Sequence, residues 1–207
     1  YDIPDPKLVL KHLENAADET PKPGDSRLQN VENHLIATPQ QSLQAAAQAV
    51  SEAGMKPLIL GDSLEGESRD AGKIHAETAL QIQKNCKPVS PPAVILSGGE
   101  TSVTVQGSGR GGPNTEFTLA LLQELRGQDG IWAIACDTDG IDGTEDNAGA
   151  FISPKSLKKS KELGLDPSGF LSNNDSYSFF YELGDLVSPG PTMTNVNDFR
   201  AILVLPA

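Results

Sequence analysis

Residues 93–116, AVILSGGETSVTVQGSGRGGPNTE, decide the fold of this 207-residue chain. The apolar run 93–96 predicts a short buried strand, and the alternating, largely β-branched run 101–105 predicts a second strand. Four glycines follow within positions 107–112. From Thr115 to Arg126 the apolar residues recur at helical spacing, which predicts a helix. The stretch therefore indicates strand, strand, glycine-rich loop and helix.

A glycine-rich loop that leads into a helix is typical of an anion site. Its backbone N–H groups are free to donate, and the helix N-terminus carries partial positive charge. Arg110 adds a planar guanidinium suited to phosphate or carboxylate. The loop fits neither GxGxxG nor the P-loop consensus. The alternative interpretation, a flexible hairpin followed by a helix cap at Asn114 or Thr115, stays open.

Strand and helix patterns alternate in the first half of the chain, which predicts a parallel α/β sheet. Thr38 is the expected N-cap of a helix that starts at Pro39. The proline-rich segment 87–92 predicts a domain boundary, so that residues 1–90 would end one domain and 91–207 would form another. The expected helices are 7–17, 39–53 and 67–85, and the expected strands are 34–37 and 56–60.

Three carboxylates follow a predicted strand at 130–135, namely Asp137, Asp139 and Asp142. Ligand sites of α/β sheets lie at the carboxyl ends of strands. Clustered carboxylates can hold Mg²⁺, and a single one can accept a proton from a hydroxyl. The alternative is an Asp-Gly turn with local hydrogen bonds. Further on, the sequence predicts helices at 155–163 and 176–183 and a strand at 201–205.

The polar loop 188–198 precedes that last strand and is rich in short hydrogen-bonding side chains. Such side chains can orient a small hydroxylated ligand. They can also satisfy the loop's own backbone groups, and both interpretations stay open.

Composition excludes several classes of function. The net charge of −12 argues against nonspecific nucleic-acid binding, and no apolar run is long enough for a membrane span. The cysteines, Cys86 and Cys136, lack metal-ligand spacing. Cys136 is expected to be a buried thiol, as in a cytosolic protein, so we expect a cytoplasmic location.

Four segments, taken together and in order, resemble the glycerate 2-kinase family, whose C-terminal part is called the MOFRL domain. Its members are also often labelled hydroxypyruvate reductases. The segments are LSGGETSVTVQGSGRGGPNTEF, ACDTDGIDGTEDNAGAFI, NNDSYSFFYELGDL and GPTMTNVNDF, within residues 93–207. Residues 19–25, 34–37 and 60–72 look like the end of the family's first domain.

The resemblance implies phosphoryl transfer from ATP to the 2-hydroxyl of D-glycerate, with Mg²⁺. It implies a three-layer αβα domain with a mainly parallel or mixed sheet, preceded by the tail of a Rossmann-like domain. Two domains would face each other across the active-site cleft. D-glycerate and ATP are the expected partners, with no nucleic acid and no membrane, and a homodimer is left open.

Roles for individual residues follow from that chemistry. Arg110 and the glycine loop would hold the substrate carboxylate or a phosphate. Asp137 or Asp139 would bind metal or accept the hydroxyl proton, and Asp139 and Asp142 are the candidate metal ligands. The other expected substrate-site residues are Ser97, Gly98, Gly99, Glu100, Gly109, Gly111, Gly112, Asn114, Glu116, Thr194, Asn195, Asn197 and Asp198.

Two departures from the family pattern matter. The family has an N-terminal half with a lysine implicated in catalysis, which this chain lacks, so we expect a C-terminal fragment whose activity alone is open. Many members also have Arg where this chain has Pro113. The alternatives to a kinase are an NAD(P)H-dependent hydroxypyruvate reductase, for which no dinucleotide fingerprint is present, and a non-catalytic ligand-binding remnant.

Overall fold

The computed structural model describes residues 6–15 and 19–207 and divides the chain into two units, Tyr1–Ile36 and Ala37–Ala207. The first unit contains α1 (Lys7–Asn15) and the 3-10 helix η1 (Ser26–Leu28), which Asp25 caps. The predicted helix 7–17 begins as expected, and its last two residues lie outside the described ranges. The predicted strand at 34–37 is wrong, because no strand among the described residues pairs with it and Leu35 and Ile36 are exposed.

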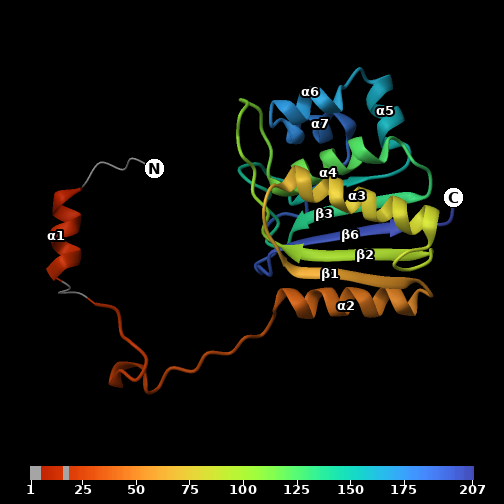
Figure 1. Ribbon diagram of the computed structural model, residues 1–207. Coiled ribbons are helices and arrows are strands. Elements are labelled where there is room, and N and C mark those ends of the chain that lie inside the picture. The colour runs from red at the N-terminus through yellow and green to blue at the C-terminus, as the bar shows by residue number, and fades with distance from the viewer. Residues whose placement is uncertain (1–5, 16–18) are drawn as a thin grey trace. The chain divides into compact units, whose positions relative to one another are not determined.

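The second unit is built on a six-stranded sheet (Figure 1). Only β1 and β2 run parallel, and every other neighbouring pair is antiparallel. The predicted α/β fold with a mixed sheet is therefore confirmed, although the sheet is mostly antiparallel. In spatial order the strands are β1 (Lys56–Leu64), β2 (Ala93–Gly99), β6 (Asp198–Val204), β3 (Ile131–Asp137), β4 (Gly149–Ile152) and β5 (Leu186–Val187).

Helices cover both faces of this sheet and make a three-layer arrangement (Figure 1). On one face, α3 (Ser68–Asn85) and α4 (Pro113–Leu125) bury the main core, in which Phe117, Phe179 and Ile202 are fully buried. On the other face, Leu43 of α2 (Pro39–Glu52) packs on Val94 and Leu96. Three short helices complete the unit, namely α5 (Ser156–Glu162), α6 (Pro167–Ser172) and α7 (Ser176–Leu183).

Local sequence signals explain most of these boundaries. Thr38 caps α2 as expected, by accepting a hydrogen bond from the Gln41 N–H with Pro39 at the first helical position. Helix α4 starts two residues earlier than predicted, with Gly112 rather than Asn114 or Thr115 as N-cap. Sequence patterns missed β4, β5 and α6, each of which is six residues or shorter.

The predicted strand at 101–105 is also wrong. This segment forms a single bridge, between Ser102 and Glu67, and otherwise runs as irregular chain. Its backbone groups find other partners: the Ser102 N–H donates to Gly66 O, and the Thr104 N–H donates to the Glu67 carboxylate. A β-branched sequence cannot form a strand where no neighbouring strand offers a ladder of backbone groups.

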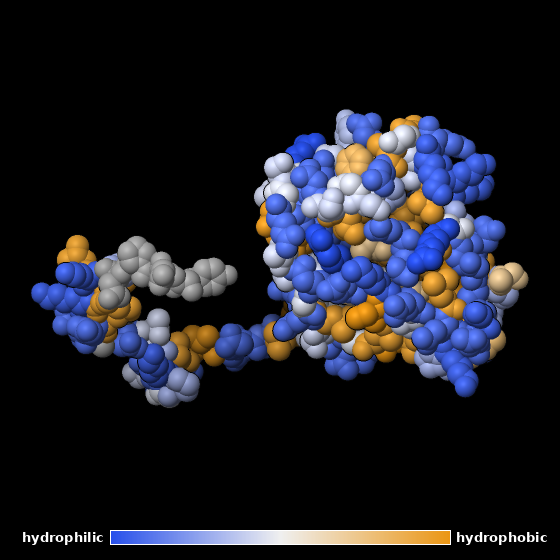
Figure 2. All heavy atoms as spheres, turned by 45° about the horizontal axis from the view of Figure 1, so that its top comes forward, coloured by the Kyte–Doolittle hydropathy of each residue, from blue (hydrophilic) through white to orange (hydrophobic). Residues whose placement is uncertain are grey.

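The proline-rich segment 87–92 lies inside the second unit, and β1 and β2, on either side of it, are adjacent in one sheet. The division at residue 90 thus separates no compact units within the described residues and stays a prediction about a longer protein. No described helix is both long and apolar enough to cross a bilayer. Figure 2 shows a largely hydrophilic surface with scattered hydrophobic patches on the visible face of this unit.

Candidate functional site

A cavity of about 420 Å³ opens at one edge of the sheet, beside the first turn of α4. Strands β2 and β3 end at this edge and the antiparallel β6 begins there, since Asp198 pairs with both Gly99 and Asp137 in the sheet register. The topology thus brings together segments that are about a hundred residues apart in the chain. The cavity is lined by Glu100, Thr101, Pro113, Asn114, Asp137, Asp139, Ile141, Asp142, Gly143 and Asp198.

Carboxylates dominate this lining, and no Lys or Arg side chain lines the cavity within the described part of the chain. Burial, together with the charges of Asp139 and Asp198, raises the pKa of Asp137 from 3.8 to about 6. The Asp139 N–H donates to Asp137 Oδ1 at 2.9 Å, which lowers this pKa in part. A carboxylate with a pKa near the working pH suits general-base chemistry.

Asp142 is buried and caps the N-terminus of α4. Its Oδ1 accepts from the backbone N–H of Asn114 at 2.8 Å and from the Asn114 side chain at 3.3 Å. Its Oδ2 accepts from the Thr115 N–H at 2.8 Å and the Thr115 hydroxyl at 2.9 Å. Burial raises the pKa of Asp142 to about 6 against the lowering effect of these hydrogen bonds. The anion that the start of this helix attracts is therefore the protein's own carboxylate.

The side-chain atoms around the cavity that could coordinate a metal ion are oxygen atoms, which suit Mg²⁺. The Asn114 side-chain oxygen is buried and has no hydrogen-bond partner among the described residues. Within those residues, no three acidic, His or Cys side chains are grouped closely enough to hold a metal by themselves. Mg²⁺ commonly takes only one or two carboxylates and completes its shell with water and phosphates, so the residues fit it. All four acceptor positions of Asp142 are used by α4, which favours Asp139 over Asp142 as a ligand.

The glycine-rich loop is fastened to residues 173–176 and does not line the cavity. Asn174 Oδ1 accepts the N–H groups of Gln106 and Gly107 at 2.8 and 3.0 Å. Three more N–H groups of the loop donate to residues 173–175, those of Ser108, Gly109 and Arg110. The loop's N–H groups are thus largely satisfied within the protein and not free for an anion.

Close packing explains why glycine is needed in this loop. A Cβ atom at Gly107 would lie 2.6 Å from Asn173 Cα, and one at Gly109 would lie 2.6 Å from Asp175 Cα. Real Cβ contacts are never this short, so the backbone would have to move. The repeated glycines therefore let two backbones approach each other. Of the expected residues, Gly109 and Gly111 lie in this packing, and Gly112 packs closely on Asp142; all three lie outside the cavity lining.

Arg110 also lies outside the cavity lining, with an exposed side chain. Its Nη1 pairs with Glu145 at 3.4 Å, and its guanidinium lies 4.8 Å from the centre of the Tyr177 ring. Its expected role in holding an anion stays a prediction, and a ligand would have to reach it outside the cavity.

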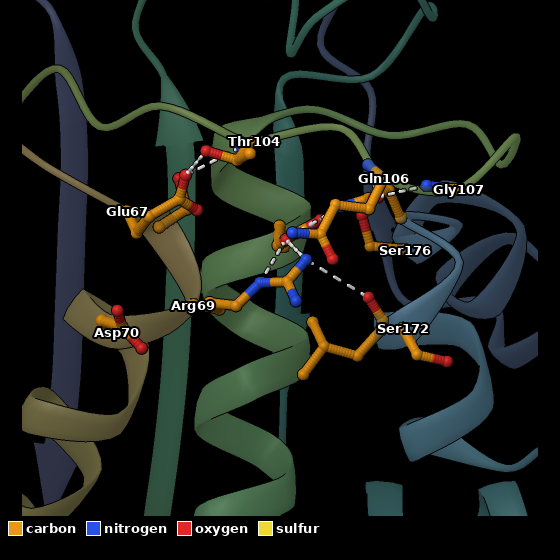
Figure 3. A network of polar contacts seen from close by, with 12 residues as sticks. Glu67, Arg69, Asp70, Thr104, Gln106, Gly107, Ser172 and Ser176 are labelled. Carbon is orange, nitrogen blue, oxygen red and sulfur yellow. Dashed lines mark hydrogen bonds and ion pairs between the residues drawn. The ribbon is translucent and has the colours of Figure 1, made fainter.

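Glu116 is buried in the first turn of α4 and is not open to a ligand. It accepts a hydrogen bond from Arg69 Nε at 2.9 Å and forms an ion pair with that side chain. It also accepts from the Asn174 side chain. Figure 3 shows Arg69 pointing from α3 toward α4, near Gln106 and Gly107 of the glycine loop. This network joins α3, α4 and the loop.

A second cavity of about 350 Å³ shares Glu100 with the first and is lined in part by Gly99 and Asn197. Loop 188–197 is joined to the Asp137–Asp139 segment: the Val196 N–H donates to the Thr138 hydroxyl at 2.8 Å, and the Asn195 side chain donates to Asp139 at 3.4 Å. The loop thus satisfies backbone groups, as one sequence interpretation has it, and it also borders a cavity through Asn197, while its role in orienting a ligand stays a prediction.

The structure therefore brings some expected residues together and separates others. Ser97 is fully buried and bonded to His75 Nε2 at 2.9 Å, and Gly98 packs near Asp198 O. Thr194 is exposed and lines neither cavity. Cys136, expected to be buried, is half-buried, and burial raises its pKa to about 12. The expected residues that do line the two cavities are Gly99, Glu100, Asn114, Asp137, Asp139, Asp142, Asn197 and Asp198.

Sequence reasoning missed four residues of the site and its support, namely Thr101, Arg200, Arg69 and Asn174. For Arg200 a signal was present, because an arginine at a buried position of an alternating strand demands a partner. Thr101 was assigned to a strand that does not form.

Comparison with known proteins places this arrangement in a family. The sequence profile of the MOFRL family matches residues 93–198. A protein of Agrobacterium vitis named "Putative hydroxypyruvate reductase" is 54% identical over 90% of this chain and 42% of its own length. The D-glycerate 2-kinase of Thermotoga maritima is 39% identical over 90% of this chain and 44% of its own length.

A solved structure supports the same placement. The crystal structure of glycerate kinase from Thermotoga maritima superimposes with a TM-score of 0.82 at 36% identity, covering 96% of this chain and 50% of that one. The chain thus spans half or less of the length of these relatives. Because the profile matches residues 93–198, about half of the chain and every residue that lines the first cavity, the chain belongs to the MOFRL family.

Proposed function

We propose that the protein transfers the γ-phosphoryl group of ATP to the 2-hydroxyl of D-glycerate, with Mg²⁺. The observation that carries the proposal is the carboxylate cavity at the sheet edge, in a chain similar to a protein named D-glycerate 2-kinase. Phosphoryl transfer depends mostly on positioning and on charge neutralisation. A triphosphate could not approach this many carboxylates without a cation, so the lining favours nucleotide that arrives as its metal complex.

Asp137 is the proposed general base. Its Oδ1 accepts from the Asp139 N–H at 2.9 Å, and the residue lines the cavity. Oδ2 accepts the proton of the substrate hydroxyl as that oxygen attacks the γ-phosphorus, and ADP leaves with the electrons of the broken bond. Burial holds the pKa of Asp137 at about 6, so the carboxylate is ionised at neutral pH and is still basic enough to take the proton.

Asp139 and Asp198 are the proposed oxygen ligands of Mg²⁺, which when bound would neutralise the phosphate charge. Asp139 also receives the Ile141 N–H at 2.8 Å, which fixes its side chain. Arg110 and loop 188–197 are proposed to meet the ends of the substrates that project beyond the cavity. ATP dependence, the metal and the 2-phosphate product are all parts of this proposal.

The test compares Asp137→Asn with Asp129→Asn in D-glycerate-dependent ADP formation. Asp129 is exposed at the opposite end of β3, so its variant controls for the loss of one negative charge. We expect Asp137→Asn to lose roughly 10²–10⁴-fold in kcat, the usual contribution of a general base, with Asp129→Asn unchanged. Equal kcat in both variants would contradict the assignment.

A reductase is the second candidate, because the 54% identical relative carries that name. Hydroxypyruvate-dependent NADH oxidation detects it directly. Oxidation of NADH without any phosphoglycerate would favour the reductase, and ligand binding without turnover would favour a binding remnant.

A further inference from the structure

Arg200 is the largest fully buried side chain of the described residues and lies beside the carboxylate cavity. It stands two residues after Asp198 on β6, so both side chains point to the same face of the sheet. Its Nη2 donates to Thr101 Oγ1 at 2.9 Å and forms an ion pair with Asp198. The guanidinium also lies 5.1 Å from the centre of the Phe117 ring.

This burial is costly. Arg200 Nε and Nη1 have no hydrogen-bond partner among the described residues, although both are buried. Burial lowers the pKa of Arg200, and the charge of Asp198 opposes that shift. Replacing a buried ion pair by apolar residues is often neutral or stabilising, so fold stability alone does not account for this arginine.

The consequence of Arg200 that reaches the cavity is the position of Asp198. That carboxylate also accepts from the Asn114 side chain at 2.7 Å and from the Thr101 N–H at 3.4 Å. Asn114 in turn donates to Asp142, so Arg200, Asp198, Asn114 and Asp142 form one connected chain of contacts. Arg200 is the fully buried first member of this series, and the other three residues line the cavity.

The other charged groups around Asp198 do not replace this cation. Glu100, Asp137, Asp139 and Asp142 line the cavity as carboxylates. On the helix side, burial and the nearby Arg200 charge lower the pKa of His75 of α3 to about 4, so His75 is neutral at pH 7. Among the described residues, Arg200 is thus the cation that pairs directly with Asp198.

We propose that Arg200 is a positioning residue for phosphoryl transfer, which acts by holding the Asp198 carboxylate in place at the cavity. The inference rests on the proposed function. Arg200 touches neither substrate nor reacting atoms, because it is fully buried and lines neither cavity. Its whole effect on turnover should therefore pass through Asp198.

A double-mutant cycle in the full-length protein tests this, with Arg200→Met, Asp198→Asn and the double variant assayed for D-glycerate phosphorylation. We expect Arg200→Met to lower kcat roughly 10–100-fold, as loss of an orienting partner commonly does, with KM little changed. In the Asp198→Asn background the same substitution should have no further effect. An equal loss in both backgrounds, or wild-type kcat in Arg200→Met, would overturn the proposal.

Arg126→Met is the matched control, because Arg126 is exposed at the far end of α4, about 18 Å along the helix from Asn114. Its kcat should equal that of the wild type. If Arg200→Met does not fold, Arg200→Lys takes its place. Lysine keeps the charge but loses the planar guanidinium, so this variant should still lower kcat. Wild-type kcat in Arg200→Lys would overturn the proposal as well.

A second readout needs no catalysis. Carboxyl ¹³C NMR follows the titration of Asp142 in the substrate-free protein. Removing the Arg200 charge should move this titration upward from its value of about 6, because Arg200 and Asp142 attract each other, whereas Arg126→Met should leave it in place. If the wild-type protein transfers no phosphoryl group but the Asp142 titration shifts in Arg200→Met, the proposed function is refuted. The influence of Arg200 on the cavity carboxylates is not. Transfer in the wild type with an unchanged kcat in Arg200→Met would refute the Arg200 inference alone.

Discussion

Asp142 should stabilise the fold by capping α4, and Asp142→Ala measures that contribution. The substitution leaves the N–H groups of Asn114 and Thr115 without their acceptor in a buried site. Each unsatisfied buried donor costs about 1–3 kcal/mol, so we expect a loss of about 3 kcal/mol in the free energy of unfolding. For a unit of this size that corresponds to a fall of roughly 6–12 °C in Tm.

Urea denaturation followed by circular dichroism measures the change. Asp166→Ala is the matched control, because Asp166 caps the short helix α6 through the Ser168 and Gly169 N–H groups but is exposed. Loss of an exposed cap costs about 1 kcal/mol. Asp142→Asn keeps one carboxamide oxygen as acceptor and should fall between the wild type and Asp142→Ala. If Asp142→Ala were no more destabilising than Asp166→Ala, the account of Asp142 as a buried cap would be refuted.

Three further predictions concern the base, the arginine and the loop. The kcat/KM of phosphoryl transfer should fall as the pH drops through about 6. Burial raises the pKa of Asp137 to that value, and only its ionised form accepts a proton. A pH profile that is flat from pH 5 to 8 would contradict the role of Asp137 as general base. Arg110→Ala should lower kcat/KM roughly tenfold or more, as expected for the loss of one charged hydrogen bond. The urea midpoint should not change, because the Arg110 side chain is exposed. Wild-type kinetics in this variant would show that Arg110 is not part of the site. Gly109→Ala should lower the urea midpoint, because its Cβ would lie 2.6 Å from Asp175 Cα. Gly164→Ala should lower it less, because no atom lies within 4 Å of the added Cβ, although the φ of +71° at Gly164 favours glycine. Equal midpoints in the two variants would argue against tight loop packing.

The long periodic segments of this protein could be predicted from sequence, and the short ones could not. Helix α2, with its Thr38 cap, and helix α7 lie where the sequence places them, because capping residues and 3.6-residue spacing are local signals. The segment 101–105 has strand-forming residues but no neighbouring strand, and that depends on the whole fold. The two-residue strand β5 exists only through pairing with β4.

The candidate site was predictable in part, where its residues stand at the ends of predictable strands. Asp137, Asp139 and Asp198 follow or begin strands, so sheet topology places them together at one edge. The glycine loop was an ambiguous signal, because glycines that serve an anion and glycines that let two backbones approach look alike in sequence. Which of the two applies depends on residues 173–176, more than sixty positions away.

The most direct test of the central claim is phosphorus NMR of D-glycerate, ATP and Mg²⁺ incubated with the longest natural form of the protein, beside its Asp137→Asn variant. The account predicts a 2-phosphoglycerate signal that grows with the wild type and is nearly lost with the variant. No phosphoglycerate from the wild type, or equal amounts from both proteins, would contradict it.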